Sequence, residues 1–279
     1  MIERTISLTN PRGLPFQVDV RVPNEQRTYP VVVICHGFKG FKDFAFFPYT
    51  SRQLCAQGLA VITMNFSGNG IGDDPLNFTA LDRFEHNTIS QELDDVAVVL
   101  DGIASGSVLG AQGDVQRIGI MGHSRGGCTA LIKASEDPRL RCVVTWASPA
   151  ALGRYSDDVL RQWKAAGRYN FVNARTRQDM FVNYAYVEDL QANRDRFSLD
   201  LAVSRLTIAY LTVHGTDDES VAVDAAHRLH SYARGGQAEL ALVEGGTHTF
   251  GTKQPFEGST SALEQAIDRT AAWFRRWLG

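Results

Sequence analysis

Ser124 lies at the centre of the pentapeptide Gly122-His123-Ser124-Arg125-Gly126. A short segment typical of a strand, 115–121, precedes it, and small and apolar residues with helical spacing, 127–134, follow it. A strand, a sharp turn and a helix in this order form the setting in which a serine hydroxyl acts as a nucleophile. Such a turn forces the serine into strained geometry, so residues nearby must be almost free of side chain. The pattern therefore favours a nucleophilic Ser124 over an ordinary glycine-rich turn.

A serine hydroxyl is a weak nucleophile until a base removes its proton, and an acid must hold that base in one tautomer. In this arrangement the acid follows a later strand and a histidine follows the last one. Here the predicted strand 208–213 is followed by two neighbouring aspartates, and the predicted strand 238–243 is followed by His248. Because three separate placements agree, we expect Ser124, one of the aspartates and His248 to act together.

Predicted strands and helices alternate along most of the chain. The predicted strands are 2–9, 16–22, 31–35, 59–64, 115–121, 142–147, 208–213 and 238–243, and the predicted helices include 44–57, 88–104, 221–234 and 261–278. The first two strands alternate apolar and polar residues on either side of a turn, which indicates an antiparallel hairpin. The others predict an α/β fold with a mostly parallel eight-stranded sheet and helices on both of its faces.

Residues 149–200 interrupt this alternation. They are polar and aromatic and contain no run typical of a buried strand. Ser156 can cap a helix, Phe171 to Val182 can form a small hairpin, and 184–197 can form a second helix. We therefore expect one domain over 1–279, with a cap insertion at about 149–200 over the carboxyl edge of the sheet, where open α/β sheets place their sites. Whether that cap is a mobile lid is left open.

Four motifs carry a resemblance to a known family. They are His36-Gly37-Phe38, the Ser124 pentapeptide, H-G-x-x-D-x-x-V at 214–221 and G-x-x-H-x-F at 245–250. With them the chain resembles the serine hydrolases of the α/β-hydrolase fold, most of all the dienelactone-hydrolase-like and prolyl-oligopeptidase-like bacterial esterases. The resemblance covers essentially the whole chain except 149–200. Dienelactone hydrolases proper carry a cysteine where this chain has Ser124, so their substrate is not implied.

The resemblance also implies a role for individual residues. The acid in the third motif lies three residues before Val221, which selects Asp218 over Asp217. The oxyanion hole is implied to consist of the backbone N–H groups of Phe38 and Arg125. Because these donors belong to the backbone, we expect the identity of the two side chains to matter less than the placement of the main chain.

The implied function is hydrolysis of a small-molecule carboxylic ester through an acyl-enzyme intermediate. Two alternatives remain open: a peptidase or amidase of the same fold, and a non-catalytic binding protein on the hydrolase scaffold. No cofactor is expected, because Gly68, Gly70 and Gly72 lack the G-x-G-x-x-G spacing of a nucleotide loop. No metal site is expected either, and His36, His123 and His214 are assigned structural roles.

Composition limits the partners and the compartment. The net charge of -3 gives no reason to expect binding to nucleic acid or to an anionic membrane surface. No apolar run approaches the roughly 20 residues needed to span a bilayer, and no secretory signal follows Met1. The four cysteines are isolated from one another, which is typical of reduced thiols, so we expect a cytoplasmic protein. Its oligomeric state is left open between a monomer and a homodimer.

Overall fold

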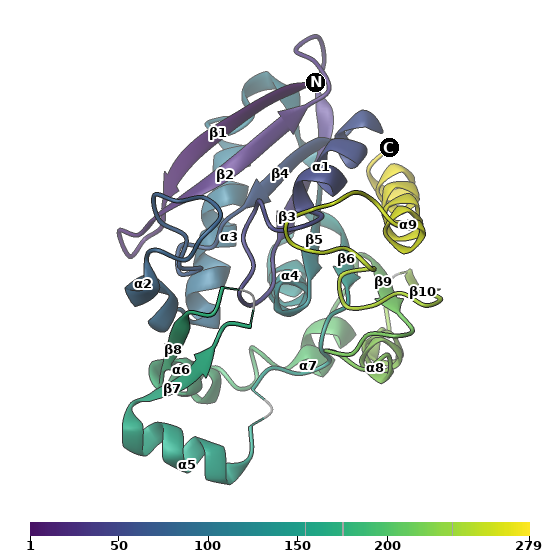
Figure 1. Cartoon of the computed structure of the whole chain (residues 1–279). Helices are drawn as coiled ribbons and strands as arrows, with labels where there is room; N and C mark the ends of the chain where they lie inside the picture. The colour runs from purple at the N-terminus through teal and green to yellow at the C-terminus, as the bar shows by residue number, and fades with distance from the viewer. Residues whose placement is uncertain (154, 175, 236) are drawn as a thin grey trace.

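Strands from both halves of the chain form one large sheet in the computed structural model, which describes residues 1–153, 155–174, 176–235 and 237–279 (Figure 1). Within those residues the sheet has eight strands in the order β1-β2-β4-β3-β5-β6-β9-β10. Their bounds are β1 (Ile2–Thr9), β2 (Pro15–Val22), β3 (Tyr29–Cys35), β4 (Ala60–Met64), β5 (Gly113–His123), β6 (Leu140–Trp146), β9 (Ala209–Gly215) and β10 (Ala238–Val243). Strand β2 is antiparallel to both of its neighbours, and the pairs from β4 to β10 are all parallel. The predicted sheet is thus confirmed.

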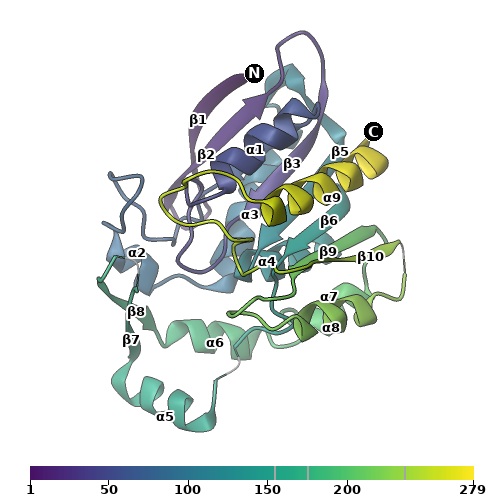
Figure 2. The same cartoon turned by 45° about the vertical axis from the view of Figure 1, so that its right-hand side comes forward.

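The central strands are continuous apolar runs because both faces of the sheet are covered. Every residue of β4 is buried, and β3 buries all of its residues except Pro30. Helices α1 (Phe47–Ala56) and α9 (Ser261–Leu278) pack on one face. The other face is covered by α3 (Ile89–Ala104), α4 (Arg125–Glu136), α7 (Leu199–Ser204) and α8 (Asp224–Tyr232) (Figure 2). This layering leaves the strand ends as the place where polar groups can gather.

Local signals account for several helix boundaries. The hydroxyl of Thr88 accepts a hydrogen bond of 3.2 Å from the backbone N–H of Gln91 and so caps the start of α3. The helix predicted at 44–57 begins three residues later, at Phe47, since Pro48 occupies its first turn. The loop after β4 ends in a short helix, α2 (Leu81–Glu85), and a 3₁₀ turn, η1 (Gly110–Gln112), precedes β5.

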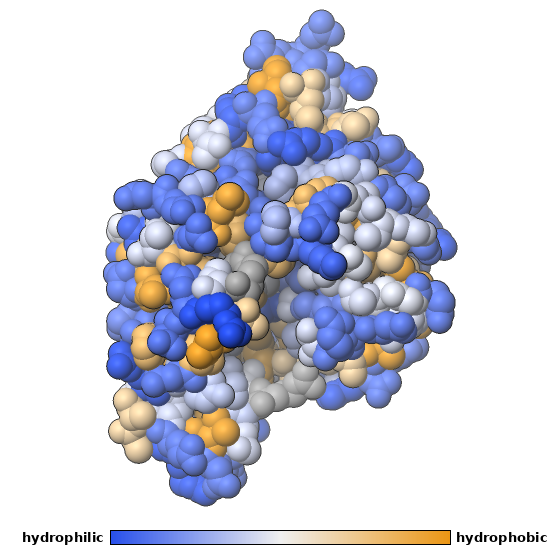
Figure 3. Space-filling view, in the orientation of Figure 1, coloured by the Kyte–Doolittle hydropathy of each residue, from blue (hydrophilic) through white to orange (hydrophobic). Residues whose placement is uncertain are grey.

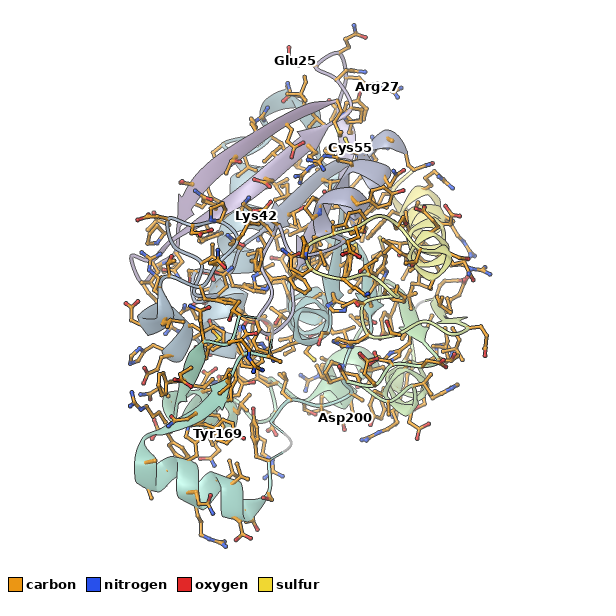
Figure 4. The ribbon with its side chains drawn as sticks, in the orientation of Figure 1. Glu25, Arg27, Lys42, Cys55, Tyr169 and Asp200 are labelled. Carbon is orange, nitrogen blue, oxygen red and sulfur yellow. The ribbon has the colours of Figure 1, made fainter. Side chains whose placement is uncertain are left out.

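Four of the elements between β6 and β9 form a small layer at the end of the molecule opposite the chain termini (Figure 1), whereas α7 of the same stretch packs on the sheet. The layer contains α5 (Asp157–Ala166), the antiparallel pair β7 (Arg168–Val172) and β8 (Asp179–Asn183), and α6 (Ala185–Ala192). The predicted second helix stops early because the side-chain amide of Asn193 donates to the carbonyl of Asp189, 3.0 Å away. Tyr169 of β7, labelled in Figure 4, packs its ring 5.3 Å from that of Trp163, which joins the strand pair to α5.

On the face shown in Figure 3, hydrophobic residues occur singly or in small groups among hydrophilic ones. None of the helices in the described residues combines the length and the apolar character that crossing a bilayer requires. All four cysteines carry free, buried thiols.

Candidate active site

Ser124 occupies the single position between β5 and α4, where the chain reverses direction. Its backbone has φ 54° and ψ -126°, a conformation that costs an L-residue roughly 1 to 3 kcal/mol. Two backbone hydrogen bonds hold it there: Ser124 N–H donates to the carbonyl of Trp146 at 2.8 Å, and Gly127 N–H donates to the carbonyl of Ser124 at 2.9 Å. The turn therefore projects the Ser124 side chain from the carboxyl end of the sheet.

The two glycines of the pentapeptide are required by close backbone contacts. A Cβ atom on Gly122 would lie 2.0 Å from the carbonyl oxygen of Gly126, and one on Gly126 would lie 2.3 Å from that of His36. A third glycine, Gly37, brings the loop after β3 against the turn, since its Cβ would lie 2.9 Å from Cβ of Ser124. No side chain fits at these points, so the packing of the turn explains the pattern in the sequence.

Asp218 and His248 meet although 30 residues separate them. His248 Nδ1 lies 2.9 Å from Asp218 Oδ2 and 3.1 Å from Oδ1, and the backbone N–H groups of Ser220 and Val221 both donate to Oδ1 at 2.8 Å. The Asp218 side chain is fully buried, and that of His248 is 16% exposed. The neighbouring Asp217, by contrast, lies exposed to solvent. The structure thus brings together the aspartate and histidine that the motifs selected.

The electrostatics of this pair favour a charged carboxylate. Burial by itself raises the pKa of Asp218, but hydrogen bonds from His214 and His248 and from the backbone N–H of Val221 outweigh it and hold the pKa well below its usual range. A carboxylate that accepts a hydrogen bond from Nδ1–H of His248 keeps the ring proton on Nδ1. Nε2 then carries no proton and can accept one.

Ser124 and His248 face the same cavity, which has a volume of about 230 Å³. Its lining comes from the loop after β3, the Ser124 turn, the insertion and the loop after β10: Gly37, Phe38, Lys39, Gly40, Phe44, Phe47, His123, Ser124, Asn173, Ala174, His248 and Thr249. A second cavity of about 220 Å³ meets Ser124 from another side and does not include His248. That cavity is lined by Phe38, Ser124, Arg125, Pro149, Ala151, Leu152, Gly153, Tyr155, Val182 and Tyr186. Residues of the 149–200 segment line both cavities.

The two residues expected to form the oxyanion hole line the same cavity as Ser124. Arg125 is the first residue of α4, so its backbone N–H has no acceptor within the helix and lies at the positive end of the helix dipole. Phe38 lines both cavities next to Ser124. An ideal Cβ on Gly37 would stand 3.5 Å from the Arg125 nitrogen, so the two main-chain segments are in contact.

His214 has a closer relation to the site than its sequence context indicated. Its ring is fully buried, and Nε2 lies 3.2 Å from Asp218 Oδ2 and 2.8 Å from the carbonyl oxygen of Val221. The sequence assigned His214 a structural role only. The signal that could have located it is its position four residues before Asp218, which brings the ring back over the carboxylate.

His123 also belongs to the wall of the site. Its Nε2 lies 2.8 Å from the carbonyl oxygen of His248, and the two rings are 4.8 Å apart. Burial lowers the pKa of His123 to about 3, and the nearby charge of His248 adds to that effect. A neutral ring with its proton on Nε2 donates to that carbonyl and so fixes the backbone of His248. The sequence assigned His123 a structural role, and the structure adds that the residue lines the cavity beside Ser124.

His36 is buried as a neutral ring beneath the Phe38 loop. Nδ1 lies 2.8 Å from the carbonyl oxygen of Gly37, and Nε2 accepts the backbone N–H of Phe66 at 3.1 Å. Burial lowers the pKa of His36 to about 3, against an ordinary value of 6.5. Protonation of Nε2 would therefore break the bond from Phe66 as well as charge a buried ring.

This gives a testable dependence of stability on pH. The unfolded chain binds a proton at His36 below about pH 6.5 and the folded chain does not, so the free energy of unfolding falls as the pH falls through that range. Between pH 6.5 and pH 5 the loss from one such histidine is about 2 kcal/mol. Urea unfolding at several pH values measures the fall in the free energy of unfolding. In His36→Gln this fall should be smaller than in the wild type by about 2 kcal/mol. The exposed His86 provides the control, since His86→Gln should retain the wild-type slope; equal slopes in all three proteins would contradict the assignment.

The described residues contain no group of three or more His, Cys, Asp or Glu side chains arranged as metal ligands. The polar groups around Ser124 are instead arranged in pairs, each histidine contacting an aspartate or a backbone carbonyl. Such a set suits proton transfer, with the backbone N–H groups of the turn available to an oxyanion.

Comparisons with known proteins agree with this architecture. A family model described as "Alpha/beta hydrolase family" matches residues 32–258. A protein from Escherichia coli described as "Uncharacterized 31.7 kDa protein in traX-finO intergenic region" is 27% identical over 127 residues, which are 45% of this chain and 39% of that protein. The matches to this and two further curated relatives cover only 32% to 39% of the length of those proteins.

Solved structures resemble the whole chain. The structure of Est1E from Butyrivibrio proteoclasticus with ferulic acid bound has a TM-score of 0.74 and 19% identity, and the match covers 98% of each chain. The esterase domain of a Rhodothermus marinus protein has a TM-score of 0.68 and 18% identity, with 100% of each chain covered. At this level of identity the likeness establishes a shared fold.

Proposed function

We propose that this chain, which belongs to the alpha/beta hydrolase family, is a serine hydrolase that cleaves carboxylic esters through an acyl-enzyme intermediate. The family membership indicates a hydrolase, and the ester substrate and the roles of the residues are the proposal. Ser124 would be the nucleophile, His248 the base and then the acid, and Asp218 the group that orients His248. The observation that carries the proposal is the pairing of His248 Nδ1 with the buried Asp218 carboxylate beside the strained Ser124 turn.

In the first half of the reaction the Ser124 hydroxyl attacks the ester carbonyl while Nε2 of His248 takes its proton. The imidazolium that forms is stabilised by the Asp218 carboxylate 2.9 Å from Nδ1. The tetrahedral oxyanion would accept hydrogen bonds from the backbone N–H groups of Phe38 and Arg125, which are fixed before charge develops. Collapse of this intermediate expels the alcohol, which receives its proton from His248. In the second half, His248 activates water in the same way and the acid is released.

The two cavities beside Ser124 support a division of the substrate. The leaving alcohol must lie within reach of His248, so it belongs in the cavity that His248 lines. The acyl group then belongs in the cavity that lacks His248, whose wall includes Phe38, Tyr155 and Tyr186. The esterase title of the Rhodothermus marinus neighbour and the ferulic acid named in that of the Butyrivibrio proteoclasticus neighbour make aromatic esters sensible members of the first substrate screen.

A fluorophosphonate probe tests the assignment of the nucleophile without knowledge of the substrate. The probe reacts with a serine only when a neighbouring base and an oxyanion hole activate it. We expect one adduct per chain, located on Ser124 by peptide mass spectrometry, and competition by p-nitrophenyl butyrate. An unlabelled protein would support the non-catalytic alternative, and a labelled protein that cleaves aminoacyl amides faster than esters would support the amidase alternative.

A further inference from the structure

The side chain of Arg125 makes a set of contacts for which the proposed mechanism has no use. Its guanidinium Nη2 lies 2.5 Å from Glu92 Oε1, and the two side chains are 15% and 1% exposed. Its carbon Cζ lies 4.6 Å from the centre of the Phe38 ring, on the opposite segment of the site. The residues expected to supply the two oxyanion donors are therefore joined through their side chains as well as being near neighbours through their backbones.

Glu92 is held rigidly at its end of this arrangement. It lies in the first turn of α3, where the helix dipole favours a carboxylate. Asn87 donates to Oε1 at 2.9 Å, and the hydroxyl of Thr129, one turn along α4 from Arg125, donates to Oε2 at 2.9 Å. A buried carboxylate with this many donors has one position available to it, so it fixes the position of the Arg125 guanidinium in turn.

The loop after β3 is anchored by buried His36, Phe41 and Lys42. The contact with Arg125 is different because it acts directly on the side chain of Phe38. The residue before it, Gly37, has no side chain, and Phe38 itself is 36% exposed. The centre of its ring lies 5.3 Å from that of Phe84 and 5.6 Å from that of Phe171, and Arg125 Cζ and Lys39 Nζ lie 4.6 Å and 5.8 Å from it. A cation over an aromatic ring is attracted to it by the ring quadrupole, and the nearer of the two, Arg125, holds Phe38 toward the start of α4.

We propose that Glu92, Arg125 and Phe38 form a side-chain bridge that sets the distance between the two backbone donors of the oxyanion hole. Arg125 and Glu92 act in it as positioning residues. The inference rests on the proposed function, because it assigns the bridge a role in stabilising the oxyanion of that reaction. It predicts that the bridge stabilises the transition state rather than the bound ester. Donors displaced by a few tenths of an ångström lose more hydrogen-bond stabilisation of the developing oxyanion than of the neutral substrate carbonyl.

The test uses two routes to the same displacement. Arg125→Met, made together with Glu92→Gln so that no lone carboxylate stays buried, removes the ion pair, and Phe38→Leu removes the ring while leaving every charge in place. Both keep the two backbone N–H groups. With p-nitrophenyl acetate we expect kcat to fall about 10- to 100-fold in each protein with KM within about threefold of wild type, less than the loss of a whole donor. The combined protein should lose little more than the larger of the two losses, because both break one bridge.

Affinity for a trifluoromethyl ketone, which forms an anionic tetrahedral adduct with a serine, provides a readout that a purely structural role would not move. Its inhibition constant should rise by the same factor by which kcat falls. Arg139→Met is the matched control: it removes an arginine paired with Asp137 and Asp101 at the other end of α4, and should leave kcat and inhibitor affinity unchanged. If Arg125→Met with Glu92→Gln does not fold, Phe38→Leu decides through the match between its losses in kcat and in inhibitor affinity at an unchanged KM, because Phe38 also lines both cavities.

Two kinds of failure can be told apart. A wild-type protein that hydrolyses no ester, or one in which Ser124→Ala retains full activity, refutes the proposed function and the bridge with it. An active wild type whose kcat and inhibitor affinity survive both bridge substitutions within about twofold, or change in KM alone, refutes the bridge and leaves the proposed function standing.

Discussion

Replacing Ser124 with alanine should lower kcat for p-nitrophenyl butyrate by about five to six orders of magnitude, the loss that follows removal of a catalytic serine in unrelated serine hydrolases. The methyl side chain of alanine cannot attack the carbonyl, and His248 then has no hydroxyl from which to take a proton. Alanine tolerates the same φ of 54° no worse than serine, and the backbone bonds of the turn to Trp146 and Gly127 remain. The melting temperature should therefore stay within a few degrees of wild type.

Ser148 provides the control for this substitution. It is a fully buried serine just beyond the end of β6, 3.7 Å from the sulfur of Cys128, and it lies outside the triad. Ser148→Ala should keep kcat within about fivefold of wild type, because the substitution removes a buried hydroxyl group that does not contact the reacting atoms. Substantial turnover by Ser124→Ala, measured on freshly purified protein without contaminating esterase, would remove the mechanism.

The second largest effect is expected from Asp218→Asn, which should lower kcat at neutral pH by about 10⁴-fold. The amide oxygen can replace Oδ1 as acceptor for the N–H groups of Ser220 and Val221, and the NH₂ group then faces His248. Nδ1 of His248 must become an acceptor, so its proton moves to Nε2, the atom that has to receive the proton of Ser124. Steady-state kinetics with a p-nitrophenyl ester measure the loss, and circular dichroism checks the fold.

Asp217→Asn is the matched control, one residue away in the same loop. Asp217 is exposed and accepts a hydrogen bond from the Thr216 hydroxyl at 3.1 Å, with no contact to His248. We expect its kcat to stay within about threefold of wild type. A larger loss in Asp217→Asn than in Asp218→Asn would overturn the choice between the two acids and with it the proposed orientation of His248.

The local features of the site were readable in the sequence because each depends on residues close to one another along the chain. The strained Ser124 turn needs Gly122 and Gly126 two positions away on each side, and the structure shows a backbone oxygen within 2.3 Å of where each Cβ would stand. The central strands were readable because burial on both faces leaves a continuous apolar run, and the first two were readable from their alternation of apolar and polar residues. The order of aspartate and histidine was the one expected of this strand–turn–helix arrangement, and the choice of Asp218 over Asp217 came from the family resemblance.

The contacts of His123 and Arg125 were decided by the tertiary structure alone. Glu92 and Arg125 are 33 residues apart on different helices, and no period or spacing in either helix marks them as partners. From the sequence, the identity of the Arg125 side chain was expected to matter less for the oxyanion hole than the placement of its backbone. That expectation considered the backbone N–H alone, because no partner of the side chain was known. Burial explains the difference: a charged side chain on the inner surface of a helix must find a counter-charge, and which one it finds depends on how two helices pack against the same face of the sheet. The sequence by itself thus determined the strands, the turn and the candidate triad, whereas the packing of distant segments decided what surrounds and positions them.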